Sequence, residues 1–351
     1  MEVVPGLHRL RTPMTSNALP WIMPYAFEGS GGVSLFDSGY GTPEASEWLT
    51  QQLHGIGYQP SDIERLIVSH GHPDHLGMAD WIREQSPRCE VIMLGREADW
   101  FGHHHGHDGY MGRMRGWLER HGVALEELKE GFRRASSDHA AGDDNRDSGD
   151  VSTETERRSW SMPQVKVDHR LQDREVLEFD GWRIEAVWTP GHTPGHLCIF
   201  EPQHRLMFTG DHVLSRITPN VSLSEEDEAA GRSPLAEFLD SLDKVARFDT
   251  HLALPAHEDV IDDLPARCAE IRRHHDRRLE EVFAGIGDGV ATASEVSSRV
   301  TWNRPYATFN VFKKRSALGE TLSHLKLLEE RGRVRRVEDE GVLRWEQIRP
   351  R

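Results

Sequence analysis

One short loop carries four side chains that can bind a metal ion, and it begins directly after an apolar strand. The strand is the run ERLIVS, Glu64–Ser69, and the loop that follows reads HGHPDH. Alternate residues of an extended segment point the same way, so His70 and His72 can reach one metal ion. Asp74 and His75 can then reach a neighbouring ion. A chain with this loop must fold so that further ligands meet it.

The same arrangement recurs at the ends of three later strands. His192 follows RIEAVW in the segment TPGHTPGH, Asp211 follows RLMFTG, and His257 follows HLALPA. Strands that each deliver a ligand at their end would build a site along the rim of a sheet. A lone histidine after a strand is usually a structural residue. Five histidines and two aspartates in this order instead indicate a metal site.

Strand-like and helix-like segments alternate along the first part of the chain, which predicts an α/β sandwich. The predicted strands cover residues 32–37, 64–69, 89–94, 183–188, 196–201, 205–210 and 251–256. The predicted helices cover residues 44–53 and 78–85. An insertion, about residues 99–165, separates the two sets of strands. It contains a helical stretch near Trp117–Lys129 and an acidic segment, 136–156, that we expect to be a mobile surface loop.

The end of the chain has the pattern of a small helical module. Apolar spacing predicts one long helix over Leu264–Gly285 and two further helices over residues 292–300 and 316–334. The run RVRRVEDEGVLRWEQ predicts a β-hairpin that turns at Asp339–Gly341. Helices followed by a hairpin indicate a winged-helix-like domain.

The ordered ligands resemble those of the metallo-β-lactamase superfamily, and of its glyoxalase II-like branch in particular. The resemblance rests on the HxHxDH motif at residues 70–75 with the downstream His192, Asp211 and His257. It spans about residues 1–262 and implies an αββα sandwich for them. Residues 263–351 would then form the helical, winged-helix-like domain.

Carried over residue by residue, the resemblance assigns a role to each ligand. It implies that His70, His72 and His192 bind a first metal ion, that Asp74, His75 and His257 bind a second, and that Asp211 bridges the two. Asp37 and His196 would hold ligands in place by hydrogen bonds, and Asp74 would also accept a proton. The expected cofactors are two divalent ions, zinc by preference, with iron or manganese as alternatives.

The family often lines its substrate pocket from the region that follows the motif. The resemblance therefore implies substrate contacts from Trp100, His104 and Tyr110, in the first part of the insertion.

Composition narrows the expected partners and compartment. The net charge of −16 opposes binding to a phosphate backbone. No segment reaches the roughly 18 uninterrupted apolar residues of a membrane span, and the start lacks the apolar core of a signal peptide. We therefore expect a cytoplasmic protein without membrane contact. The three cysteines lie far apart and suggest neither disulfides nor a thiolate zinc site.

Three reactions are open to such a site. The resemblance favours hydrolysis of a small ester, thioester or lactone, so the expected partner is a small acyl compound. Cleavage of a phosphodiester or RNA is the second, since the superfamily includes nucleases and one mitochondrial ribonuclease carries a similar C-terminal winged helix. An iron oxidoreductase is the third, because persulfide dioxygenases keep the HxHxDH motif.

The sequence weighs against the second and third of these reactions. Only 45 residues lie between Asp211 and His257, too few for the inserted domain of β-CASP nucleases. Four arginines within residues 331–336 form a basic cluster, but such a cluster is more often a solvated edge or the contact of a homodimer. A full set of seven ligands fits two ions, whereas a mononuclear iron centre needs only a triad.

Overall fold

The computed structural model describes residues 1–14, 19–104, 110–124 and 166–348, with the backbone alone at 102–104, 110–113 and 312. The chain forms two compact units. Unit 1 contains residues 1–105, 138–219 and 243–267, and unit 2 contains residues 106–137, 220–242 and 268–351. The predicted domain boundary at residues 262/263 stays a prediction, because the two compact units are defined by contacts between residues and each combines several separate segments.

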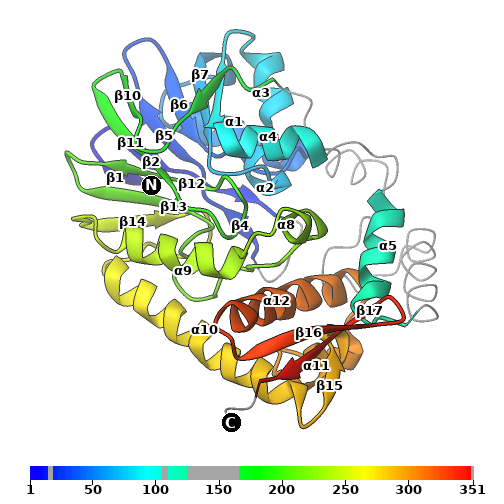
Figure 1. The fold of residues 1–351 in the computed structure, drawn as a ribbon. Helices are drawn as coiled ribbons and strands as arrows, with labels where there is room; N and C mark the ends of the chain where they lie inside the picture. Colours follow the sequence, from blue (N-terminus) through cyan, green and yellow to red (C-terminus); the bar gives the residue numbers. More distant parts are fainter. Residues whose placement is uncertain (15–18, 105–109, 125–165, 349–351) are drawn as a thin grey trace. The chain divides into compact units, whose positions relative to one another are not determined.

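The first sheet of unit 1 has seven strands in the order β1-β2-β5-β6-β7-β8-β9, and Figure 1 labels β1, β2, β5, β6 and β7 among them. The bounds are β1 Glu2–Val4, β2 Leu7–Arg9, β5 Tyr25–Glu28, β6 Val33–Phe36, β7 Ile63–Val68, β8 Glu90–Leu94 and β9 His169–Leu171. The strands from β6 to β9 run parallel, so their carboxyl ends share one edge. β6 and β8 are almost wholly buried, as expected of strands that are covered on both faces.

The second sheet of unit 1 has five strands in the order β10-β11-β12-β13-β14. The bounds are β10 Val176–Phe179, β11 Trp182–Trp188, β12 Leu197–Glu201, β13 Leu206–Gly210 and β14 Leu252–Pro255. Only the last pair, β13 and β14, is parallel. A separate two-stranded ribbon joins β3, Thr12–Pro13, to β4, Trp21–Ile22.

The two sheets of unit 1 pack face to face around aromatic side chains. Phe27 and Phe36 of the first sheet share a buried cluster with Ile184 and Phe208 of the second. The ring of Phe208 lies 5.2 Å from that of Phe27 and 5.7 Å from that of Phe36, measured between centroids. Burial of such rings is the main favourable contribution to this interface.

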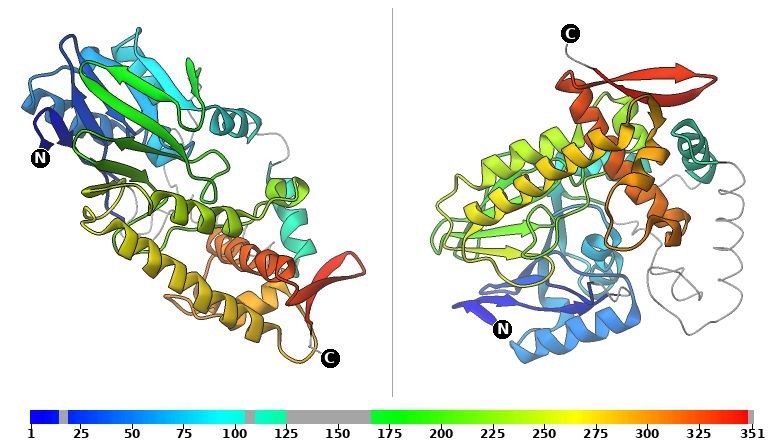
Figure 2. Two further views of the ribbon diagram at one scale, coloured as in Figure 1. Left: turned by 60° about the vertical axis from the view of Figure 1, so that its left-hand side comes forward. Right: turned by 90° about the horizontal axis from the view of Figure 1, so that it is seen from below.

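Helices cover the other face of the first sheet, as Figure 2 shows for α1. Leu49 and Leu53 of α1 and Ile82 of α3 pack against alternate residues of the strands, such as Leu35 and Val91. The helices of this part of unit 1 are α1 Pro43–Gly55, η1 Pro60–Asp62, α2 Pro73–Leu76, α3 Ala79–Gln85 and α4 Gly95–His104. Unit 1 therefore has the helix-on-sheet-on-sheet layering that the α/β pattern predicts.

Unit 2 is built mostly from helices and a small sheet. Its elements are α5 Tyr110–Arg120, α8 Glu225–Ala229, α11 Ala293–Arg299, η2 Tyr306–Thr308, α12 Val311–Glu330, β15 Val290–Thr292, β16 Val334–Asp339 and β17 Val342–Gln347. The three strands pair in the order β15-β17-β16. Two longer helices, α9 Pro234–Val245 and α10 Leu264–Ile286, have residues in both units.

Three predicted segments differ from the structure, each for a local reason. The loop after β7 is not extended throughout, because Pro73 starts the short helix α2. The helix predicted from residue 316 begins at Val311, since the Asn310 side chain caps it by accepting from the Lys313 amide. In the stretch predicted near Trp117–Lys129, α5 ends at Arg120 and residues 121–124 are not helical, while residues 125–129 lie outside the described part of the chain.

Gly122 explains this early end of α5. Its φ is +90°, and a Cβ at this position would lie 2.4 Å from Thr292 Cβ. A glycine with positive φ is a common helix terminator. The acidic segment predicted at residues 136–156 lies outside the described residues. No helix in the described part of the chain is both long enough and apolar enough to cross a membrane.

Candidate metal centre

The predicted ligands gather where strands of unit 1 end. Asp211 directly follows β13, while His70, His192 and His257 come shortly after the ends of β7, β11 and β14. Side chains from both sheets thus meet at one rim of the sandwich. The structure brings all seven predicted ligands into three overlapping groups, and within each group the possible ligand atoms lie within 4.8 Å of one another. Two of these groups share no residue, and the third, with Asp211, overlaps both.

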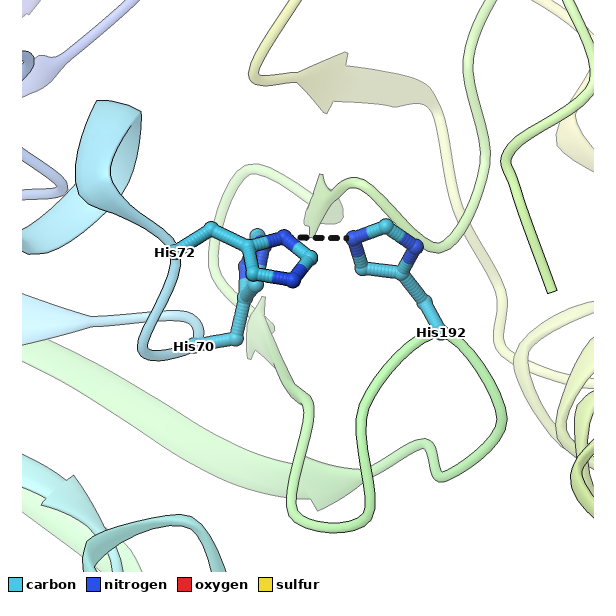
Figure 3. A group of neighbouring side chains, drawn as sticks. All are labelled: His70, His72 and His192. Atoms are coloured by element: carbon cyan, nitrogen blue, oxygen red, sulfur yellow. Dashed lines mark hydrogen bonds between the residues drawn. The ribbon is translucent and has the colours of Figure 1, made fainter. Parts of the chain in front are cut away.

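The first group consists of three imidazoles (Figure 3). His70 Nε2 lies 2.8 Å from His72 Nδ1, and His192 Nε2 lies 3.1 Å from the same atom. Three ring nitrogens this close together cannot all carry protons. A single metal ion, however, can accept all three lone pairs. Histidine nitrogens are preferred ligands of zinc.

The second group combines a carboxylate with two imidazoles, Asp74, His75 and His257. Asp74 Oδ2 lies 3.4 Å from His257 Nε2 and 3.6 Å from His75 Nε2. Both imidazoles therefore present the same nitrogen, Nε2, to one carboxylate oxygen.

Asp211 lies between the two groups and presents one oxygen to each. Its Oδ1 lies 3.4 Å from His75 Nε2 and 3.3 Å from His257 Nε2. Its Oδ2 lies 3.6 Å from His192 Nε2. This placement is what a carboxylate that bridges two ions requires.

Two buried atoms of the site lack hydrogen-bond partners among the described residues. They are His75 Nε2 and Asp211 Oδ1. Buried polar atoms are normally satisfied, so an orphaned pair calls for an explanation. A cation between them would satisfy both, and the residues present therefore fit a bound metal ion.

Comparison with known proteins agrees with this geometry. Residues 24–257 match the model of the Metallo-beta-lactamase superfamily. The chain belongs to this superfamily. The superfamily fold implies divalent metal ions, and together with the ligand groups it supports a metallo-hydrolase.

Several relatives within the superfamily are similar over different lengths. Probable metallo-hydrolase YqjP of Bacillus subtilis is 24% identical over 91% of this chain and 91% of its own. Lactamase-like protein aptB of Emericella nidulans is 33% identical over 32% of this chain and 33% of its own. The match to this fungal protein thus spans about a third of its length.

Two solved structures are similar over almost the whole chain. A metallo-beta-lactamase family protein from Thermus thermophilus, TTHA1429, is 27% identical with a TM-score of 0.75, covering 99% of this chain and 100% of that one. A beta-lactamase domain protein from Burkholderia ambifaria is 25% identical with a TM-score of 0.79, covering 99% of this chain and 93% of that one.

Asp37 holds His75, a predicted ligand of the second group, by a hydrogen bond. Its carboxylate accepts from His75 Nδ1 at 2.8 Å and from the Ser69 amide and hydroxyl at 2.8 and 2.9 Å. Because His75 Nδ1 is the donor, Nε2 is left to face the second group. Asp37 is buried and has a φ of +61°, which aspartate tolerates better than most residues.

His196 is held through both of its ring nitrogens, and His257 is held through one. His196 Nε2 accepts the Asp211 amide at 3.1 Å, and its Nδ1 lies 2.8 Å from Thr189 Oγ1. His196 therefore holds the backbone of Asp211 in place, and it has no ring nitrogen left to bind a metal ion. His257 Nδ1 lies 3.0 Å from the Trp21 carbonyl oxygen, which leaves its Nε2 for the site.

The electrostatics differ between the two groups. Burial lowers the pKa of His72 to about 3 and, with the nearby His75, holds the pKa of His70 well below its usual value. Both imidazoles are thus neutral ligands near pH 7. In the second group burial would lower the pKa of His75, but Asp74, Asp211 and Asp37 outweigh it and hold that pKa well above normal.

The carboxylates of the site stay ionised. Burial alone would raise the pKa of Asp74, but His75 and the hydrogen bond from His257 lower it to about 2. Burial is likewise outweighed at Asp211, where His257 and His75 hold the pKa well below normal. This concentration of negative charge attracts a cation, and a divalent ion can take the place of the proton that His75 would otherwise hold.

Two residues that hold the site together by hydrogen bonds, Ser69 and Glu97, are not among the residues predicted from the sequence. Ser69 joins the Asp37 carboxylate to the imidazoles, and Glu97 joins the loops that carry the first group. Ser69 directly precedes the motif, so its position was a usable indication. Glu97 stands in the first turn of a helix, where acidic residues are common for a purely local reason.

The predicted substrate contacts are only partly described. Trp100 is half-buried on α4, and its ring centroid lies 6.5 Å from that of His72. It therefore borders the first group. The side chains of His104 and Tyr110 lie outside the described residues, so their contacts with substrate stay predictions.

Proposed function

We propose that the protein hydrolyses a small ester, thioester or lactone at a centre with two divalent metal ions. The observation that carries this proposal is Asp211, whose two oxygens face different groups of imidazole nitrogens. In this proposal one ion is held by His70, His72 and His192, the other by Asp74, His75 and His257, and both by Asp211. Zinc suits this nitrogen-rich set best.

When bound, such ions lower the pKa of water toward neutrality and polarise the substrate carbonyl. The residues of the chain supply the remaining parts of the reaction. Asp37 and the Trp21 carbonyl keep the imidazoles of the second group in one orientation. Asp74 is ionised at neutral pH and lies beside His75 and His257, so it is the carboxylate that would accept a proton there. Trp100 borders the space where substrate binds.

We assign the chain to the glyoxalase II-like branch and its last part to the winged-helix class. The element order α10, β15, α11, α12, β16, β17 and the sheet order β15-β17-β16 support the second assignment. The HxHxDH motif supports the first.

Phosphodiester cleavage is the less favoured alternative. Arginines lie in and just before β16, the first strand of the C-terminal hairpin, but three of them are already paired with glutamates. The pairs are Arg333–Glu280, Arg335–Glu346 and Arg336–Glu329. Arginines neutralised in this way are poor phosphate ligands. A role for the cluster in a homodimer stays a prediction.

The test is a substrate panel on protein depleted of metal and reloaded. Thioesters, lactones, simple esters and a phosphodiester are each assayed with zinc, iron and manganese, with oxygen uptake followed in parallel. We expect acyl turnover that returns with about two equivalents of zinc per chain. Turnover of the phosphodiester alone, or oxygen uptake with one iron, would replace the proposed reaction.

A further inference from the structure

A buried glutamate connects the two loops that carry the three-histidine group. Glu97 lies in the first turn of α4 and has no exposed surface. Its Oε1 accepts from the Gly71 amide at 2.8 Å. Its Oε2 accepts from the Thr193 hydroxyl at 2.9 Å and from the Gly195 amide at 2.8 Å. One carboxylate thus holds donors from two segments far apart in the sequence.

These donors stand directly beside metal ligands. Gly71 lies between His70 and His72, and Thr193 follows His192. We propose that Glu97 is the positioning residue of the three-histidine group, because it sets the separation between the two loops that supply it. This inference rests on the proposed function, in which that group holds a metal ion.

Both loops pack closely against the helix that carries Glu97. A Cβ at Gly195 would lie 2.1 Å from the Glu97 amide nitrogen, and a Cβ at Gly71 would lie 2.9 Å from Phe101 Cδ2. The backbones of both loops therefore lie directly against α4. Hydrogen bonds to a buried carboxylate are stronger than those to a neutral acceptor, so the arrangement is stiff as well as close.

The second group is held by different residues. His75 is oriented by Asp37, and His257 by the Trp21 carbonyl. None of the three donors to Glu97 belongs to Asp74, His75 or His257. Loss of the Glu97 carboxylate should therefore weaken one metal position and leave the other, which a general loss of stability would not do.

The variant that tests this is Glu97→Gln. The amide keeps the size of the side chain but turns an N–H₂ toward at least one N–H or O–H donor, which breaks a hydrogen bond. The control is Asp99→Asn on the same helix, where the exposed carboxylate pairs with Arg170 at the surface. Both variants and the wild type are loaded with ¹¹³Cd²⁺ and examined by NMR, with the first-group signal assigned from its loss in His192→Ala.

We expect two signals from the wild type and from Asp99→Asn. In Glu97→Gln the first-group signal should shift, and cadmium affinity there should fall by about 10- to 100-fold, while the other signal is unchanged. Unchanged signals, or equal loss of both, would overturn the proposal. Thr193→Val removes a single hydrogen bond and provides a milder variant if Glu97→Gln does not fold. No shift of the first-group signal in that variant would also overturn it.

The wild-type spectrum separates this inference from the proposed function. Two wild-type signals with an unaffected Glu97→Gln would contradict only the role of Glu97. A wild type that binds no second ion would contradict the proposed dinuclear centre itself, and the inference with it.

Discussion

At the scale of single residues, the hydrogen bond at one ring nitrogen decides which nitrogen of each imidazole faces the site. Asp37 takes Nδ1 of His75, and the Trp21 carbonyl takes Nδ1 of His257, so both present Nε2. His196 lies as close to the cluster, with its ring centroid 5.1 Å from that of His70. Its Nε2 accepts the Asp211 amide, however. This hydrogen bond distinguishes His196, as a supporting residue, from the predicted metal ligands.

Asp211→Asn should remove most of the function. The amide carries no charge to offset the repulsion between two cations, and its N–H₂ would face an imidazole nitrogen or a metal ion. We expect turnover to fall by on the order of 10³-fold or more, beyond the roughly 10- to 100-fold typical of residues that only hold a ligand in place. Elemental analysis should show lower metal content. Asp249→Asn, at a largely exposed aspartate, is the matched control and should retain its metal.

Asp37→Asn should have a smaller effect, confined to the second group. Asparagine tolerates the positive φ of this position, so the change tests the hydrogen bonds without adding backbone strain. We expect a loss of about 10- to 100-fold in activity or metal affinity. Titration with a metallochromic chelator would measure it. A loss as large as that of Asp211→Asn would mean that Asp37 binds metal directly.

At the scale of elements, the strands of the site and their ligand-bearing ends could be predicted from the sequence. Apolar runs that end in histidine or aspartate locate β7, β13 and β14 to within a residue or two. Helix ends were less predictable, because α12 depends on a cap by Asn310 and α5 ends at a glycine that packs against Thr292. The role of Glu97 could not be predicted, since its donors come from segments about 25 and 100 residues away.

A buried histidine pair joins α10 to α12 within unit 2 and should make stability depend on pH. His324 Nδ1 donates to the Glu320 carbonyl at 2.7 Å, so its Nε2 accepts from His275 Nδ1 at 3.1 Å. Burial, only partly offset by the hydrogen bond to Glu320, lowers the pKa of His324 to about 3. In the unfolded chain the same group titrates near pH 6.5.

Between pH 6.5 and about 3 the unfolded chain therefore binds the additional proton, and the free energy of unfolding falls as the pH drops. One such group contributes up to about 1.4 kcal/mol per pH unit. Urea unfolding at several pH values gives the free energy of unfolding as a function of pH. This free energy should change less steeply with pH in His324→Gln than in the wild type, and the exposed His251→Gln is the control. An unchanged slope in His324→Gln would show that the pair does not titrate on unfolding.

At the scale of the whole molecule, charge argues against nucleic acid as substrate. The net charge is −16, and three of the four arginines within residues 331–336 already contact glutamates. We expect dissociation constants weaker than about 10⁻⁴ M for short DNA or RNA duplexes at physiological salt. Fluorescence anisotropy would measure them. Submicromolar binding that weakens steeply with added salt would instead indicate a phosphate-binding face.

Anomalous diffraction from a crystal of the metal-loaded protein would show whether two metal ions flank Asp211. Data collected on either side of the metal absorption edge locate each ion without reference to activity. We predict two anomalous peaks, one beside Oδ2 among His70, His72 and His192, and one beside Oδ1 among Asp74, His75 and His257. A single peak, or peaks that do not contact Asp211, would contradict the dinuclear centre.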